Sequence, residues 1–147
     1  MITTQLKTIL NSAGCTLVLY ESSQLANILT DQSNQTDVIG LILQPTDVDL
    51  DIKANAIPEH YNPIIIEILK QVRLEDLAEN NEATFDALLQ ICKKVILYLI
   101  DSEDFKKIQP MKLTKILETK YDANVIGWTM PLDLYYLHNE GKDPCLP

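Results

Sequence analysis

Twelve residues near the end of the chain, Val125 to Tyr136, constrain its fold more than any other stretch. Every even-numbered position there is apolar, whereas the odd-numbered positions are mixed and include Asp133 and Tyr135. A period of two places successive side chains on opposite faces of a β-strand. We therefore expect a strand with one face buried against a core and the other in a wetter environment.

A second strand-like stretch, Leu113 to Tyr121, precedes the first, and residues 122–124 (DAN) separate the two. Asp and Asn favour turns because their short side chains bond to the nearby backbone. The two stretches together predict a long C-terminal β-hairpin. Pro131 has no amide proton to donate, so we expect its strand to be an edge strand or a bulged one.

The clearest helical pattern runs from Phe85 to Leu99, where apolar side chains recur on one stripe and polar ones occupy the other side. Asn81 or Thr84 can cap its start. The stretch Ile64 to Val72 fits a strand or a helix, and we favour a strand for its first half.

The remaining segments are shorter. We expect short helices at residues 3–10, capped by Thr3 or Thr4, and 22–29; strands at 16–20, 38–43 and 47–52; and loops at 30–37 and 53–63. The chain is thus predicted to be an α+β domain. Its mostly antiparallel sheet has a long C-terminal hairpin packed on one main amphipathic helix, with short helices at the N-terminus.

The composition is that of a folded domain, with 46% apolar and 22% charged residues in a chain of 147. We expect one domain over residues 1–139 and a flexible tail over 140–147, which contains Gly141 and two prolines. The sequence has neither a long apolar run that could span a membrane nor the apolar core of a signal peptide. We therefore expect the protein to be made in the cytoplasm, with no membrane partner.

The net charge of −9 disfavours tight binding to nucleic acid or to an anionic membrane, since both depend on lysine and arginine. Cys15, Cys92 and Cys145 are odd in number and far apart, so they indicate neither a disulfide framework nor a zinc site. We expect the first two to be small core residues.

Patterns typical of catalysis, metal binding or nucleotide binding are missing from the sequence. Asp47, Asp49 and Asp51 resemble the start of a calcium loop, but Ile52 and Pro58 stand where that loop needs glycine and glutamate. His60 and His138 have no second ligand at metal spacing, and the four glycines form no phosphate-binding loop. We predict no cofactor and no enzymatic activity.

Aromatic and polar residues of the hairpin and of the preceding loop are the candidates for contacts between subunits. Tyr135 and Asp133 lie on the odd-numbered face of the predicted strand, away from the core. His60 and Tyr61 are adjacent in the predicted loop 53–63. Because aromatic residues are enriched at interfaces and edge strands invite pairing, we take Tyr135, Asp133, Tyr61 and His60 as candidate interface residues.

The order of these segments resembles that of small neck and tail-completion proteins of tailed bacteriophages, including tail-terminator-like proteins. The closing stretch DANVIGWTMPLDLYY is similar to their terminal sheet strands, and YNPIIIEILKQV resembles ring proteins from the portal-to-tail region of crAss-like phages. The resemblance covers most of Met1 to His138. It implies a structural virion protein that forms a homo-oligomeric ring next to other portal, neck and tail ring proteins. The ring would join head to tail around a channel through which DNA passes without specific binding.

Two other functions stay open at this stage. A small acidic cytoplasmic adaptor that occupies a basic partner would be a monomer or dimer with a discrete acidic patch. An enzyme with a dispersed active site drawn from His60, Tyr61 and nearby acids would need a deep pocket with convergent polar groups.

Overall fold

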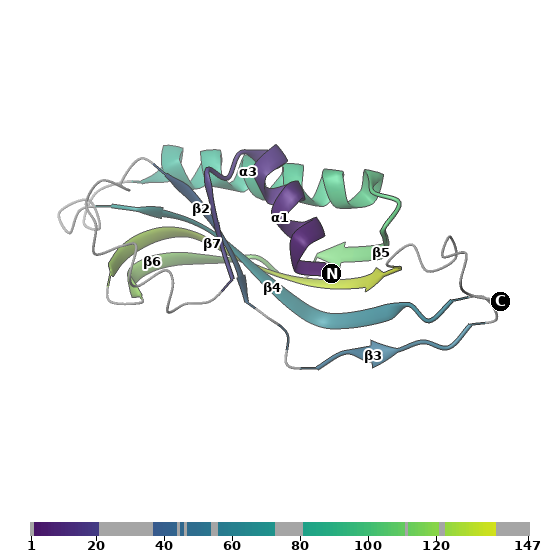
Figure 1. The fold of residues 1–147 in the computed structure, drawn as a ribbon. Coiled ribbons are helices and arrows are strands. Elements are labelled where there is room, and N and C mark those ends of the chain that lie inside the picture. Colours follow the sequence, from purple (N-terminus) through teal and green to yellow (C-terminus); the bar gives the residue numbers. More distant parts are fainter. Residues whose placement is uncertain are drawn as a thin grey trace.

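The computed structural model describes residues 2–20, 37–43, 45, 47–53, 56–72, 81–110, 112–120 and 123–137. Within them, two helices cover one face of a seven-stranded sheet (Figure 1). The helices and strands are α1 (Ile2–Ala13), β1 (Leu17–Leu19), β2 (Val38–Leu43), β3 (Asp49–Leu50), β4 (Glu59–Gln71), α3 (Glu82–Asp101), β5 (Phe105–Pro110), β6 (Thr114–Lys120) and β7 (Ala123–Tyr136). The helix expected at 22–29, most of the loop expected at 30–37 and the tail at 140–147 lie outside the described residues.

The sheet has the order β1-β2-β4-β7-β5, with β3 paired to β4 and β6 paired to β7. β1 and β2 are parallel, and the other pairs are antiparallel. The predicted α+β class is therefore confirmed, with a mixed sheet. β2 has the predicted bounds, whereas β5 was not anticipated.

β4 corrects two sequence-based expectations. It runs from Glu59 to Gln71 as one strand, so the predicted loop 53–63 ends at residue 58 and the ambiguous stretch 64–72 is strand nearly throughout. The register shifts between Tyr61 and Ile64, which places one extra residue in β4 relative to β7. Tyr61 and Ile64 are three positions apart and would face opposite sides of a regular strand. Because of the bulge, both face the helices.

Pro131 predicted an edge strand or a bulged one. β7 is neither: it is an interior strand, and the extra residues at its two register shifts lie in β4 and β5. It pairs with β4 along one side and with β6 and then β5 along the other. On one side, Pro131 pairs with Ile65 of β4. On the other side, it lies in the gap between Leu132, where the pairing with β5 ends, and Thr129, where the pairing with β6 begins. A residue without an amide proton fits there because the ladder on the second side is interrupted.

The main core lies between the sheet and the two helices, and it contains the even-numbered side chains of β7. Ile126, Met130, Leu132, Leu134 and Tyr136 are buried in it. Trp128 is half-buried at its border, where its Nε1 donates a 2.9 Å hydrogen bond to the carbonyl oxygen of Phe85 in α3.

The other face of the sheet is less wet than the alternation predicts, because it carries a second apolar cluster. This cluster contains Leu19, Ile39, Leu41, Leu69, Ile116 and Val125. The odd-numbered face of β7 is therefore buried at its start, and it becomes polar toward Asp133 and Tyr135.

The helix starts also differ in detail from the sequence-based expectations. α1 begins at Ile2, so Thr3 and Thr4 lie inside its first turn rather than before it. Asn81 occupies the N-cap position of α3, but its side chain makes no capping hydrogen bond. No helix in the described part of the chain is long and apolar enough to cross a membrane.

Candidate interaction surfaces

Three of the four candidate interface residues come together at one end of the sheet. His60 of β4 lies opposite Tyr135 of β7, and their rings stack with centroids 4.3 Å apart and planes 4° from parallel. Asp133, two residues before Tyr135 on the same face, places Oδ1 2.6 Å from Nε2 of His60. A pairing between residues 73 positions apart in sequence is decided by the sheet register alone.

Lys107 of β5 completes this group, which we call the His60 cluster: His60, Asp133, Tyr135 and Lys107. The Nζ atom of Lys107 lies 5.1 Å from the centroid of the Tyr135 ring, within the range of a cation–π contact. The cluster presents an aromatic surface with one acid and one base on three adjacent strands. Such a surface suits recognition of another protein, because aromatic side chains with polar neighbours are enriched at protein interfaces.

Tyr61, the fourth candidate, lies on the opposite face of β4 and is only 6% exposed. Its hydroxyl donates a 2.5 Å hydrogen bond to Oε1 of Glu59. Burial, followed by this bond to Glu59, raises the pKa of Tyr61 well above its ordinary value. Tyr61 is therefore a core residue and not part of the cluster.

A segment that we call the arm projects an apolar surface that the sequence analysis did not single out. The arm is residues 47–53 and 56–58, which include β3. It is held to β4 by the pairs Asp49–His60 and Leu50–Glu59, and a bridge between Lys53 and Ala56 joins its two halves. Leu50 is 63% exposed and Ile52 is 82% exposed, and Val48 and Ile57 are exposed as well.

The sequence predicts a strand at 47–52, where aspartates alternate with apolar residues. The structure keeps β-pairing only at Asp49 and Leu50, along the border of β4 opposite β7 (Figure 1). The apolar side chains of this stretch are exposed. Alternation alone does not reveal this exposure, because it shows that two faces differ and not whether another element covers either of them.

A second exposed apolar surface lies on the last turns of α3, and we call it the helix surface. Leu97 and Ile100 are each 57% exposed, and Tyr98 is also exposed. Lys93 and Lys94 are exposed one turn earlier and neighbour Leu97 and Tyr98 at helical spacing. A signal for this surface exists in the sequence: the six residues 95–100 (VILYLI) are all apolar, so they cannot all fit on one buried stripe.

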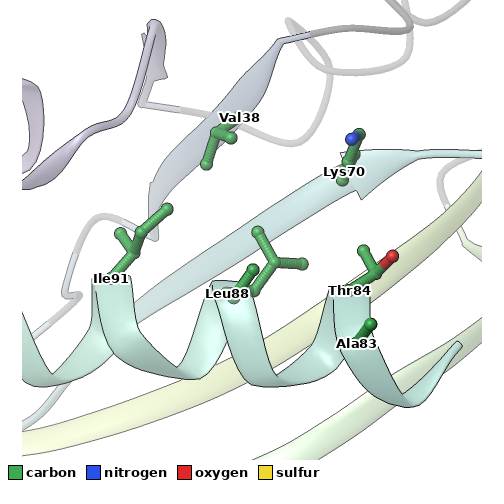
Figure 2. A pocket seen from close by; sticks show the side chains of 7 residues that line it. Val38, Lys70, Ala83, Thr84, Leu88 and Ile91 are labelled. Atoms are coloured by element: carbon green, nitrogen blue, oxygen red, sulfur yellow. The ribbon is translucent and has the colours of Figure 1, made fainter.

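A cavity of about 240 Å³ lies between the first half of α3 and the ends of β2 and β4 (Figure 2). Its wall is mainly aliphatic, and Lys70 and Thr84 are its polar side chains. The residues that line it are Val38, Lys70, Ala83, Thr84, Ala87, Leu88 and Ile91.

In the described ranges, no group of three or more His, Cys, Asp or Glu side chains is placed to hold a metal ion. Cys15 and Cys92 are buried and free, as expected for small core residues. Burial raises the pKa of each thiol to about 12. His138 and Cys145 lie outside the described residues.

Comparison with known proteins finds no matching family model, no matching curated protein and no matching solved structure.

Proposed function

We propose that this chain is a structural subunit of a homo-oligomeric ring in the portal–neck–tail region of a tailed phage, where it joins head to tail around the DNA channel. One observation carries the assembly part of the proposal. Of the eight large apolar side chains exposed in the described residues, seven belong to the arm or to the helix surface. Exposed apolar side chains gathered in patches, rather than scattered singly, are typical of protein interfaces.

The two surfaces are different from one another, which favours a ring over a simple dimer. A two-fold dimer uses one surface that contacts its own copy, whereas a ring needs two different surfaces that meet head to tail. In this proposal the long hairpin of β6 and β7, with α3 packed against it, is the rigid body of the subunit. The arm and the helix surface provide its contacts.

The phage setting rests on the resemblance to neck and tail-completion proteins and is consistent with the charge of the chain. A net charge of −9 makes an acidic channel wall possible. Because DNA is strongly anionic, it would pass along such a wall without binding to it.

An acidic adaptor is the second candidate, and the arm itself is the observation that favours it. Asp47 and Asp49 are exposed and Asp51 is partly exposed, so the arm presents alternating carboxylates to solvent. A basic partner could bind them directly. This function would require one-to-one complexes and no closed assembly.

The proposal is tested by measuring the mass of the purified protein over a wide concentration range by native mass spectrometry and light scattering, with negative-stain images of any large species. Closed particles of uniform size and copy number would support the ring. A protein that stays monomeric at the highest concentrations would overturn it. A monomer that forms a stoichiometric complex with a basic protein would support the adaptor instead.

A further inference from the structure

We propose that the arm of one copy seats on the helix surface of the next copy, so that these two surfaces form the repeating contact of the assembly. The inference rests on the proposed function and deepens it by naming the contact. It follows from three observations: the chemistry of the arm, the chemistry of the helix surface, and their positions on the sheet.

The arm separates apolar and acidic side chains onto two faces. Val48, Leu50 and Ile52 are spaced two apart in an extended segment, so they share one face. Ile57 lies on the same face, directly opposite Ile52 on the returning half of the arm. This follows from the backbone pairing on either side of them: the Asp51 amide donates to the Pro58 carbonyl, and Lys53 pairs with Ala56. The carboxylates of residues 47, 49 and 51 point to the opposite face of the segment, where Asp51 lies 3.7 Å from Nζ of Lys53.

The helix surface has the complementary composition. Leu97, Tyr98 and Ile100 provide exposed apolar area, and Lys93 and Lys94 border it on the preceding turn. A lysine side chain can lay its aliphatic stem along an apolar neighbour and still extend its ammonium group to a nearby carboxylate. Asp101, Glu103 and Asp104 lie at the C-terminal end of this surface, and the other acids of α3, Glu82 and Asp86, lie in its first half.

The basic side chains at this surface are Lys93 and Lys94. The exposed lysines of β5, Lys106 and Lys107, lie on the other face of the sheet, where Lys106 is opposite Tyr135 and Lys107 contacts the Tyr135 ring. An acidic, apolar arm thus has a basic, apolar surface of the same chain as its counterpart. This charge complementarity favours a second copy over an unrelated partner as the occupant.

The sheet places the two surfaces on opposite flanks of the same end of the subunit. Glu59 lies opposite Leu50 on one side and Tyr136 on the other, and Tyr136 pairs in turn with Phe105 of β5. Two strands, β4 and β7, therefore separate the arm from β5, and α3 ends four residues before β5 begins. In Figure 1 the helices lie above the sheet and β3 follows its lower border. Copies placed side by side in the direction of the strand order would bring one arm to the neighbouring helix surface.

The test uses two variants, Leu50→Asp on the arm and Leu97→Asp on the helix surface. Each puts a charge into one apolar surface, and we expect each alone to weaken assembly by about tenfold or more. Because both side chains are exposed, the subunit should stay folded, which circular dichroism and Trp128 fluorescence would check. Leu117→Asp is the matched control: it changes an exposed leucine of β6 outside both surfaces and should leave assembly unchanged.

Mixing the two variants gives the sharpest readout. A Leu50→Asp copy keeps an intact helix surface, and a Leu97→Asp copy keeps an intact arm. The mixture should form one-to-one heterodimers that grow no further, while each variant alone stays monomeric. Native mass spectrometry separates these species by mass.

The possible failures are distinguishable. If wild-type protein forms uniform rings and both variants form the same rings, the arm–helix contact is wrong while the ring proposal stands. If wild-type protein is monomeric throughout the concentration range, the ring proposal fails and this contact fails with it. If the variants lose assembly but their mixture forms no heterodimer, the two surfaces do not bind each other and the inference is overturned.

Discussion

Thr129 and Glu67 lie directly opposite each other on β7 and β4, and the Thr129 hydroxyl donates a 2.8 Å hydrogen bond from Oγ1 to Oε2 of Glu67. Glu67 is only 1% exposed, and it is the buried charged residue of the described chain. Its side chain lies on the sheet face that carries the second apolar cluster. A carboxylate at such a position depends on its hydrogen-bond donors, because burial without them is costly.

Removing this donor should destabilise the fold. We expect Thr129→Val to lower the free energy of unfolding by about 1–3 kcal/mol, since the shape is kept and a buried carboxylate loses a bond. Urea denaturation followed by Trp128 fluorescence measures it. Thr114→Val is a matched control, because Thr114 is the exposed β6 residue opposite Thr129. Equal stability of the two variants would show that the hydrogen bond contributes nothing.

Gly127 should not tolerate a side chain. A Cβ atom there would overlap the carbonyl oxygen of Ile68 and lie 2.9 Å from its carbonyl carbon, and this backbone belongs to the paired strand β4. We expect Gly127→Ala to cost about 3 kcal/mol or more, measured by chemical denaturation.

Gly40→Ala is the comparison for this change. Its Cβ would meet side-chain atoms instead, Leu10 Cδ1 at 3.0 Å and Cys15 Sγ at 3.1 Å, which can shift. We expect a smaller loss of about 1 kcal/mol. A Gly127→Ala protein as stable as Gly40→Ala would contradict the close approach of β7 to β4 at this point.

Alkaline pH should destabilise the protein through its buried thiols and phenols. Burial raises the pKa of Cys15 and Cys92 from 9.0 to about 12, and it raises the pKa of Tyr61 and Tyr136 in the same direction. The folded state thus prefers the protonated forms. Their contribution is complete below pH 9 or so and is lost as the pH rises toward about 12.

The measurement is the urea midpoint at several pH values between 7 and about 11. The double variant Cys15→Ala/Cys92→Ala should show a smaller decline above pH 9 than the parent chain. The same burial predicts that neither thiol reacts with a disulfide reagent at pH 8 or so until the chain unfolds. Fast labelling of either cysteine in the native protein would show that it is accessible.

Tyr135 should matter more for assembly than for folding. Tyr135→Glu removes the ring stacked on His60 and adds a second carboxylate beside Asp133. The His60 cluster adjoins the arm, because His60 pairs with Asp49. We expect a loss of about 1 kcal/mol in unfolding free energy and a clearly weaker assembly, measured by light scattering. Tyr135→Phe, which keeps the stacking ring, should assemble normally. Unchanged assembly of a folded Tyr135→Glu protein would remove Tyr135 from the interface.

The sequence by itself determined the elements whose pattern is local. The alternation from Val125 to Tyr136 predicted β7 and the side chains that it buries toward the helices, and the stripe from Phe85 to Leu99 predicted α3. The bounds of β2 were also correct. For β7 and α3 the spacing of apolar residues within one segment indicates both the conformation and the side that is buried toward the other layer, whereas β2 is a short continuous apolar run buried on both faces.

Tertiary structure decided everything that depends on a neighbour. Ile64–Val72 was ambiguous because strands buried on both faces lose their alternation, and only pairing with β2 and β7 makes this run part of β4. The same non-local pairing made β7 an interior strand and brought His60 to Asp133. It also left Leu50 and Ile52 uncovered on the arm, because exposure depends on which elements pack nearby and not on the order of residues along the strand.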